Sequence, residues 1–211
     1  RWKFALKRMW ELKKHVPDKI FSIRYEDLVA DPEHHFRDIC RFIGIPYERI
    51  VNLGAAQFDI YREDPDPPPP EYKRKLGIGE TTRVILFAGS GAGRGIHEMD
   101  QLKALNEAIE SGRLRNAHVL YRPHPWHGSR LQEEDFFELK FKHITMDPLL
   151  ADWYKKERSS ANSGVFIIDY RHSNTVLKAC DIAISGISTM MLEAAVLGKP
   201  IICSVYDEHI Q

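Results

Sequence analysis

The chain has 211 residues, of which 43% are hydrophobic, and its 30 basic side chains are balanced by 30 acidic ones. This length can bury a sizeable core, and the balanced charge gives no global field for nucleic acid or an anionic membrane, so a phosphate site must be local. Cys40, Cys180 and Cys203 are far apart and mostly inside apolar runs, which favours free thiols in a reducing, cytoplasmic compartment over disulfides or a zinc site. No apolar run approaches the roughly 20 residues of a membrane-spanning helix. Because the chain begins with Arg1, we expect a piece of a longer protein, whose missing parts could contact a membrane.

Residues 1–53 are expected to form a small helical unit. Residues 2–14 place apolar side chains at helical spacing between lysines and arginines, which predicts an amphipathic helix. A short strand is expected at 19–23. Asp31-Pro32 then offers an N-cap followed by proline at the first helical position, and the helix that it opens is predicted to end at Gly44.

The composition changes after residue 53. Residues 62–66 are charged and without apolar periodicity, and Pro67 to Pro70 are four successive prolines. Such prolines donate no backbone hydrogen bonds and favour an extended polyproline conformation. We therefore expect residues 54–80 to be a proline-rich linker, extended and poorly packed from Glu63 to Pro70.

Strand and helix patterns alternate from residue 81 to residue 211. Strands are expected at 84–88, 118–121, 165–169, 182–185 and 200–205, and helices at 99–110, 173–179 and 189–197. This alternation specifies a parallel sheet with right-handed crossovers. The predicted fold class is therefore α/β, a Rossmann-like doubly wound domain over residues 81–211.

Two loops that follow expected strands carry residues suited to a phosphorylated ligand. Arg122-Pro123-His124-Pro125 follows the strand at 118–121, and Gly186-Ile187-Ser188-Thr189 follows the strand at 182–185. Open α/β sheets bind their ligands at the carboxyl ends of the strands. Arg122 is a natural phosphate partner, and the prolines stiffen the loop of His124. A structural role is the alternative for this histidine.

The second loop opens a predicted helix. The hydroxyls of Ser188 and Thr189 and the free amides of the first helical turn could face an anion, with Gly186 allowing its close approach. Glu193 lies one turn after Thr189, so its carboxylate could accept hydrogen bonds from ribose hydroxyls of the same ligand. An N-cap Ser or Thr with a capping-box partner would explain the pattern without a ligand. The sequence leaves both interpretations open.

A glycine-rich loop, Gly89-Ser90-Gly91-Ala92-Gly93-Arg94-Gly95, follows the strand at 84–88. It has neither the spacing of a dinucleotide fingerprint nor the Gly-Lys-Ser/Thr ending of a P-loop, which disfavours NAD binding and ATP hydrolysis. Arg94 and the glycine backbone could approach a diphosphate, although a flexible surface loop would have the same composition. Several other Asp and His residues lack the HExxH or CxxC spacing of metal ligands, so no metal is assigned: Asp147, Asp152, Asp169, His97, His143, His172 and His209.

The segments at 18–32 and 36–46 resemble the C-terminal part of PAPS-dependent sulfotransferases, and the resemblance covers about residues 1–50. That family holds the cofactor with an N-terminal phosphosulfate loop and with an Arg and a Ser midway along the chain, and neither segment is present here. The resemblance therefore implies a remnant, a truncated neighbouring domain or a docking element. The alternative is that Arg24, Glu26 and Asp27 merely close a salt-bridged corner.

The segments at 54–59, 84–91, 121–126 and 181–200 together resemble the donor-binding half of GT-B glycosyltransferases, over about residues 54–211. The similarity is to capsule, polysialic acid and CDP-glycerol polymer transferases. In those enzymes a His-Pro motif and a Ser/Thr-rich motif with a downstream Glu contact the donor nucleotide, and the loop after the first strand approaches the diphosphate. The resemblance places the first motif at His124-Pro125 and the second at Ser188, Thr189 and Glu193.

The GT-B resemblance implies binding of a CDP-, CMP- or UDP-activated sugar or polyol phosphate, with no further cofactor, for transfer to a glycan or related polymer. The expected donor-binding residues are Gly89, Ser90, Gly91, Arg94, Arg122, His124, Gly186, Ser188, Thr189 and Glu193. Catalytic residues stay unassigned, because GT-B bases commonly come from an acceptor domain that this chain lacks, so little turnover is expected. The alternatives are a fragment of a PAPS-dependent sulfotransferase and a non-catalytic nucleotide-binding or docking module. No nucleic-acid partner is expected.

Overall fold

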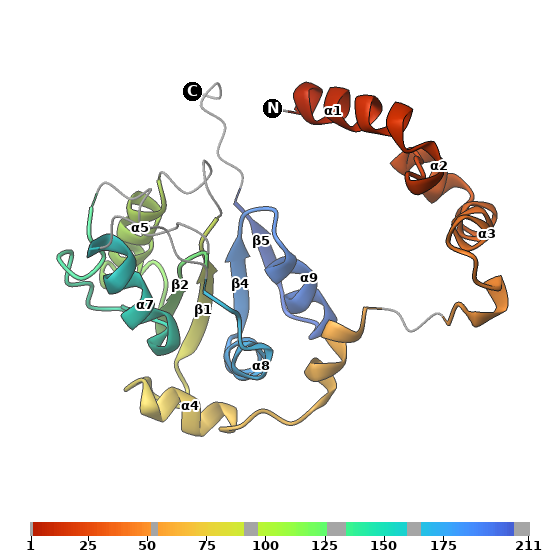
Figure 1. The fold of residues 1–211 in the computed structure, drawn as a ribbon. Helices are drawn as coiled ribbons and strands as arrows, with labels where there is room; N and C mark the ends of the chain where they lie inside the picture. The colour runs from red at the N-terminus through yellow and green to blue at the C-terminus, as the bar shows by residue number, and fades with distance from the viewer. Residues whose placement is uncertain (1, 52–54, 91–96, 126–133, 160–165, 205–211) are drawn as a thin grey trace. The chain divides into compact units, whose positions relative to one another are not determined.

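The computed structural model describes residues 2–51, 55–90, 97–125, 134–159 and 166–204. The chain divides into two compact units, Arg1–Gly54 and Ala55–Gln211 (Figure 1). Among the described helices, none combines the length and the apolar composition that crossing a bilayer requires.

The first unit is helical. Its elements are α1 (Trp2–His15), η1 (Pro17–Lys19), α2 (Tyr25–Ala30), α3 (Pro32–Ile43) and η2 (Tyr47–Arg49). The predicted ends of α3 are confirmed: the side chain of Asp31 accepts a hydrogen bond from the amide of His34, and Gly44 closes the helix at φ 76°. The strand expected at 19–23 is wrong. A 3-10 turn occupies its start, and the described part of this unit offers no other strand with which to pair.

The second unit is an α/β domain, and the predicted fold class is confirmed. Five parallel strands form one sheet in the order β3-β2-β1-β4-β5, flanked by helices. In chain order the elements are η3 (Ala56–Arg62), α4 (Pro69–Lys75), β1 (Arg83–Ala88), α5 (Glu98–Glu110), β2 (Ala117–Arg122), β3 (Ile144–Met146), α7 (Pro148–Ser159), α8 (Tyr170–Ala179), β4 (Ile182–Ser185), α9 (Thr189–Val196) and β5 (Ile201–Cys203).

One of the expected strands is replaced by another. Residues 166–169 form no strand; they lead to Asp169, whose side chain accepts hydrogen bonds from the amides of Arg171 and His172 and so starts α8. The sheet instead takes β3, which pairs with β2. At three residues β3 is too short to show a period, and neither it nor α7 is among the expected elements.

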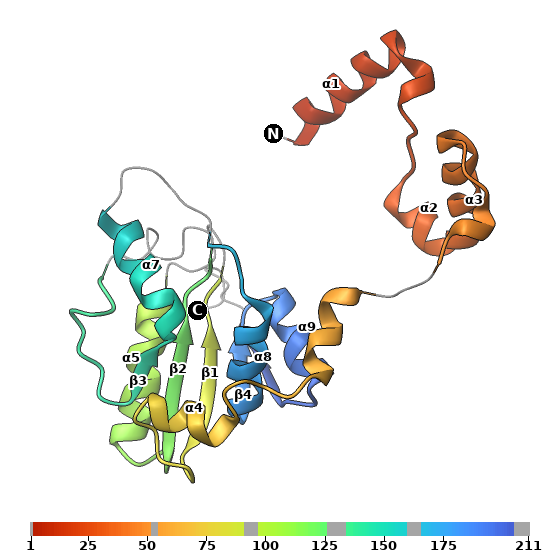
Figure 2. The ribbon, with the colours of Figure 1, turned by 60° about the horizontal axis from the view of Figure 1, so that its bottom comes forward.

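Side chains of the central strands alternate between two cores, which is what double winding requires. Val84 and Leu86 of β1 pack in one core with residues of η3, α4, α8 and α9. Ile85 and Phe87 pack in the other with residues of α5 and α7. Figures 1 and 2 show the two groups of helices around the sheet. Because both faces of the sheet are buried, packing fixes where the described strands end at its carboxyl edge.

Residues 55–80 differ from the expected linker, because they belong to the second unit. Tyr61 of η3 and Tyr72 of α4 are buried in the first of these cores, and α4 packs against α8 (Figure 2). The amide of Asn174 donates hydrogen bonds to the carbonyls of Ile60 and Glu63. Two of the four prolines stand at the start of α4, where proline is favourable because its missing N–H is not needed. The prolines therefore open a helix rather than extend a spacer.

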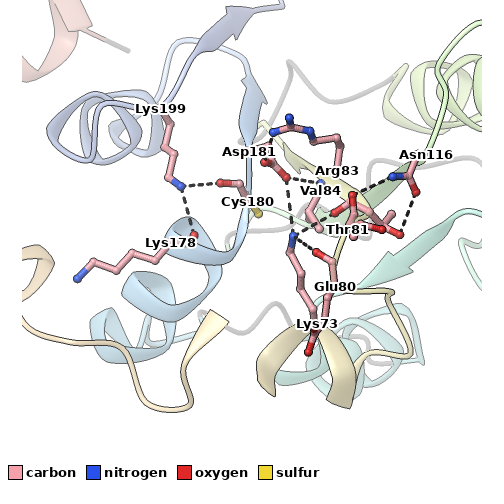
Figure 3. A network of polar contacts seen from close by, with 11 residues as sticks. Lys73, Glu80, Thr81, Arg83, Val84, Asn116, Lys178, Cys180, Asp181 and Lys199 are labelled. Carbon is pink, nitrogen blue, oxygen red and sulfur yellow. Dashed lines mark hydrogen bonds and ion pairs between the residues drawn. The ribbon is translucent and has the colours of Figure 1, made fainter. Parts of the chain in front are cut away.

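The opposite, amino edge of the sheet is tied together by charged side chains (Figure 3). Asp181, directly before β4, accepts hydrogen bonds from the amide of Val84 at 2.8 Å and from the guanidinium of Arg83 at 2.9 Å. Lys73 of α4 reaches the same edge and donates to the carbonyl of Thr82 at 3.0 Å. These contacts join α4 to β1 and β4 and leave the carboxyl edge for other interactions.

Candidate functional site

The strand order creates a switch point between β1 and β4. From β1 the chain continues to β2 and β3 on one side and returns to β4 and β5 on the other, so the exits of β1 and β4 diverge and leave a crevice between them. A pocket lies at this carboxyl edge, and we call it the switch-point pocket. It is lined by Ala88, Gly89, Arg122, Pro123, His124, Pro125, Leu150, Ile168, Ser188, Thr189 and Met190.

Half of the expected donor-binding residues line this pocket: Gly89, Arg122, His124, Ser188 and Thr189. Two more, Ser90 and Gly186, line a smaller adjacent cavity together with Glu98, Gln101, Ser185 and Ser204. Glu193 lines neither. Gly91 and Arg94 lie outside the described residues.

Two glycines allow the strand exits to approach one another. A Cβ on Gly89 would lie 2.7 Å from Oε2 of Glu98 and 3.0 Å from the amide nitrogen of His124. A Cβ on Gly186 would lie 2.6 Å from Oγ of Ser90. Gly186 was expected to make room for a ligand, and the structure shows that it makes room for Ser90.

Ser188 is the N-cap residue of α9, yet its side chain makes no capping hydrogen bond. Its hydroxyl lies 2.8 Å from that of Ser185 instead. Glu193 is five residues beyond the N-cap and is therefore outside the capping-box position. No acceptor among the described residues takes the amide protons of Thr189 and Met190, so the first turn of α9 keeps donors for a ligand.

Glu193 faces the protein interior. It is 5% exposed, and its Oε2 accepts a 2.7 Å hydrogen bond from the hydroxyl of Tyr61. Burial raises the pKa of Glu193 above its ordinary value, against the opposing effects of Tyr61 and Arg122. The carboxylate thus anchors η3 to α9, and the structure does not bring it to the pocket.

Arg122, at the end of β2, is held by a buried set of polar side chains. Its Nε lies 3.0 Å from Oδ2 of Asp147, and one terminal nitrogen donates to the hydroxyl of Ser173 at 3.1 Å. Oδ1 of Asp147 lies 2.7 Å from Nε2 of His172. Burial disfavours the charge on Asp147, but the contact with His172 and the charge of Arg122 outweigh it and hold the pKa of Asp147 below its ordinary value.

This arrangement fixes the guanidinium of a residue that lines the pocket. Among the described residues, its polar partners are bound through Nε and one terminal nitrogen, which leaves the second terminal nitrogen as a donor for an anion. Asp147, His172 and Ser173 hold a residue of the candidate site, and the sequence did not reveal this role. Asp147 directly follows β3, His172 and Ser173 lie in α8, and only the sheet brings them to the end of β2.

Glu98 is a second buried acid that the sequence did not reveal. It accepts hydrogen bonds from the hydroxyl of Tyr121 at 2.7 Å and from the amide of Ser90 at 2.5 Å. Burial raises its pKa to about 7, although both hydrogen bonds lower it. This carboxyl group therefore exists in both protonation states near neutral pH.

One group of potential metal ligands is found among the described residues, namely His34, His35 and Asp38 of α3, whose ligand atoms lie within 4.8 Å of one another. It belongs to the first unit. Asp38 also pairs with Arg41, which opposes cation binding. The described residues of the switch-point pocket contribute no such group.

Comparison with known proteins concerns the first unit. A family model described as the sulfotransferase family matches residues 1–49. This match agrees with the resemblance of about the first fifty residues, so the first unit is sulfotransferase-like and associates the chain with transferases. The match ends before the second unit and does not cover the switch-point pocket. A search of curated proteins finds no match to the chain.

Proposed function

We propose that the second unit binds a CDP-, CMP- or UDP-activated sugar or polyol phosphate at the switch-point pocket, for glycosyl or glycerophosphoryl transfer to a glycan or polymer. The observation that carries the proposal is the convergence of Arg122, His124 and the start of α9 on one pocket at the carboxyl edge. These groups come from separate strand exits. Parallel sheets bind nucleotides at this edge.

The lining of the pocket offers polar and apolar groups that suit the two parts of a nucleotide. Arg122 and the amides of α9 can neutralise a diphosphate without a metal, in the way that helix N-termini bind phosphate. Leu150, Ile168 and Met190 supply apolar surface for a nucleoside. Because Tyr61 holds Glu193 outside the pocket, a ribose has to be recognised by the residues that line the pocket.

A second candidate, PAPS-dependent sulfuryl transfer by the parent protein, is favoured by the match of residues 1–49 to the sulfotransferase family. The second unit would then be a nucleotide-binding or docking module beside a sulfotransferase. The two candidates predict different ligands for the second unit, because the sulfotransferase cofactor carries a 3′-phosphate and an adenine.

Calorimetric titration of the whole chain with CDP, CMP, UDP, NAD and PAP separates the candidates. We expect the three pyrimidine nucleotides to bind more tightly than NAD and PAP. Tight binding of PAP with no response to pyrimidine nucleotides would reverse the order of the two candidates. Consumption of donor that depends on an acceptor would distinguish a transferase from a docking module.

A further inference from the structure

Glu98 is the first residue of α5 and contacts the exit of β1, beside the switch-point pocket. It is 3% exposed, and both of its carboxylate oxygens are used, one by the amide of Ser90 and the other by the hydroxyl of Tyr121. The carboxylate lies so close to Gly89 that a Cβ on this glycine would be 2.7 Å from Oε2 of Glu98. Gly89 itself lines the pocket. A ligand phosphate placed on Gly89 would therefore have a single glycine between it and the carboxylate.

The described side chains that face Glu98 carry no compensating charge. In the described part of the chain no Lys, Arg or His forms an ion pair with it. Its neighbours are Tyr121 of β2, Gln101 of its own helix, and Ser185 and Ser204 at the exits of β4 and β5. Burial holds the pKa of Tyr121 well above its ordinary value, so this neighbour is neutral. His97, the preceding residue, pairs with Asp100. Among the described residues, two hydrogen bonds support the ionised form.

We propose that Glu98 is a positioning residue for the exit of β1, and that the site binds a diphosphate together with one proton, which Glu98 accepts. This inference rests on the proposed function. A negative ligand near Gly89 opposes the carboxylate, and like charges favour the neutral acid. The proton comes from solvent and forms a carboxylic acid, and no bond of the ligand changes. The neutral acid can still accept from the amide of Ser90 while its O–H donates to the oxygen of Tyr121, so the exit of β1 keeps its position.

The coupling can be measured by calorimetric titration with CDP-glycerol, whose diphosphate keeps a constant charge between pH 5 and 9. At pH 7, in two buffers of different ionisation enthalpy, we expect an uptake of about half a proton, because Glu98 is half ionised there. Between pH 6 and 8 the affinity of the wild type should fall about tenfold more than that of Glu98→Gln, because the protonated fraction of the free site falls by that factor. Proton exchange at groups other than Glu98 is common to both proteins and cancels in this difference.

Glu107→Gln is the matched control, since Glu107 lies on the same helix with a side chain that is 75% exposed. It should retain the proton uptake of the wild type. The positioning role can be tested without ligand, because the amide of Ser90 donates to Glu98. The chemical shift of this amide is followed by NMR as pH is changed. This resonance should titrate in the wild type and in Glu107→Gln and should lose the transition in Glu98→Gln.

The outcomes are distinguishable. Binding of CDP-glycerol with the same proton uptake in wild type and Glu98→Gln would overturn the coupling and leave the proposed function intact. Absence of binding by both proteins would overturn the proposed function and the coupling with it. A Ser90 resonance that is unaffected by Glu98→Gln at any pH would overturn the positioning role.

Discussion

The hydroxyl of Tyr61 donates a 2.7 Å hydrogen bond to Glu193, across 132 residues of sequence. Tyr61 lies in η3, within the segment whose composition predicts a linker, and Glu193 lies in α9, where its spacing from Thr189 predicts a ligand contact. The bond explains both differences. It makes η3 part of the domain, and it uses the carboxylate that was expected to bind ribose.

Removing this hydroxyl should destabilise the domain. Tyr61→Phe leaves a buried carboxylate without its donor, which costs about 1–3 kcal/mol of unfolding free energy in chemical denaturation at pH 7. Tyr170→Phe, at a tyrosine that is 39% exposed, is the control and should change the free energy by less than about 0.5 kcal/mol. Equal stabilities of the two variants would show that the bond contributes nothing.

Glu193→Gln should separate structure from binding. We expect it to lower the unfolding free energy and to leave the affinity for CDP or UDP unchanged, because the side chain lies outside the switch-point pocket. Calorimetry and denaturation of the same preparation provide the two measurements. A loss of affinity for nucleosides that carry ribose, with unchanged affinity for pyrophosphate, would restore the expected role of Glu193 as a ribose ligand.

The stability of the protein should depend on pH through Glu98. Its pKa is raised from 4.5 to about 7, so the folded state binds the proton more tightly than the unfolded state does. The stabilisation is fully present below pH 4.5 and is lost as pH rises to about 7, an interval that corresponds to about 3 kcal/mol. Glu98→Gln should flatten the denaturation free energy over this range. An unchanged pH profile in Glu98→Gln would contradict the assignment.

Asp147 should be essential for stability because it compensates a buried cation. Asp147→Asn leaves Arg122 buried without its counter-charge, which costs about 3–5 kcal/mol. Asp152→Asn, at an exposed position of α7, is the matched control. Because the pKa of Asp147 is lowered, its contribution is present above pH 3.8 and is lost as pH falls through the folded pKa. Thermal melting at pH 7 that is equal for both variants would contradict the pairing.

The segment 55–80 should be required for folding of the domain. A fragment of residues 55–211 should show a cooperative thermal transition, whereas residues 81–211 should not, since that fragment lacks Tyr61, Tyr72 and Ile78 of the core. Circular dichroism during heating measures both. If residues 81–211 melt as cooperatively as residues 55–211, the segment is a linker after all.

Periodicity was sufficient to predict the alternating strands and helices that define the α/β class, because β1, β2 and β4 are apolar runs. It failed where the signal is short or the context is tertiary. β3 has three residues, and the prolines at the start of α4 have the same composition as a spacer. In the site, the loops of His124 and Ser188 could be predicted because each follows a strand. Glu98, Asp147 and His172 could not, since only the folded sheet brings them to Ser90 and Arg122.

The central claim is that the switch-point pocket binds the nucleotide, and the most direct measurement is calorimetric affinity for CDP and UDP in three variants. His124→Ala and Ser188→Ala should each weaken binding by about 1–3 kcal/mol with unchanged melting temperatures, the usual cost of losing a hydrogen bond to a charged group. Ile187→Ala, in the same loop at a side chain that is 74% exposed, should bind like the wild type. Wild-type affinity in all three variants would contradict the claim.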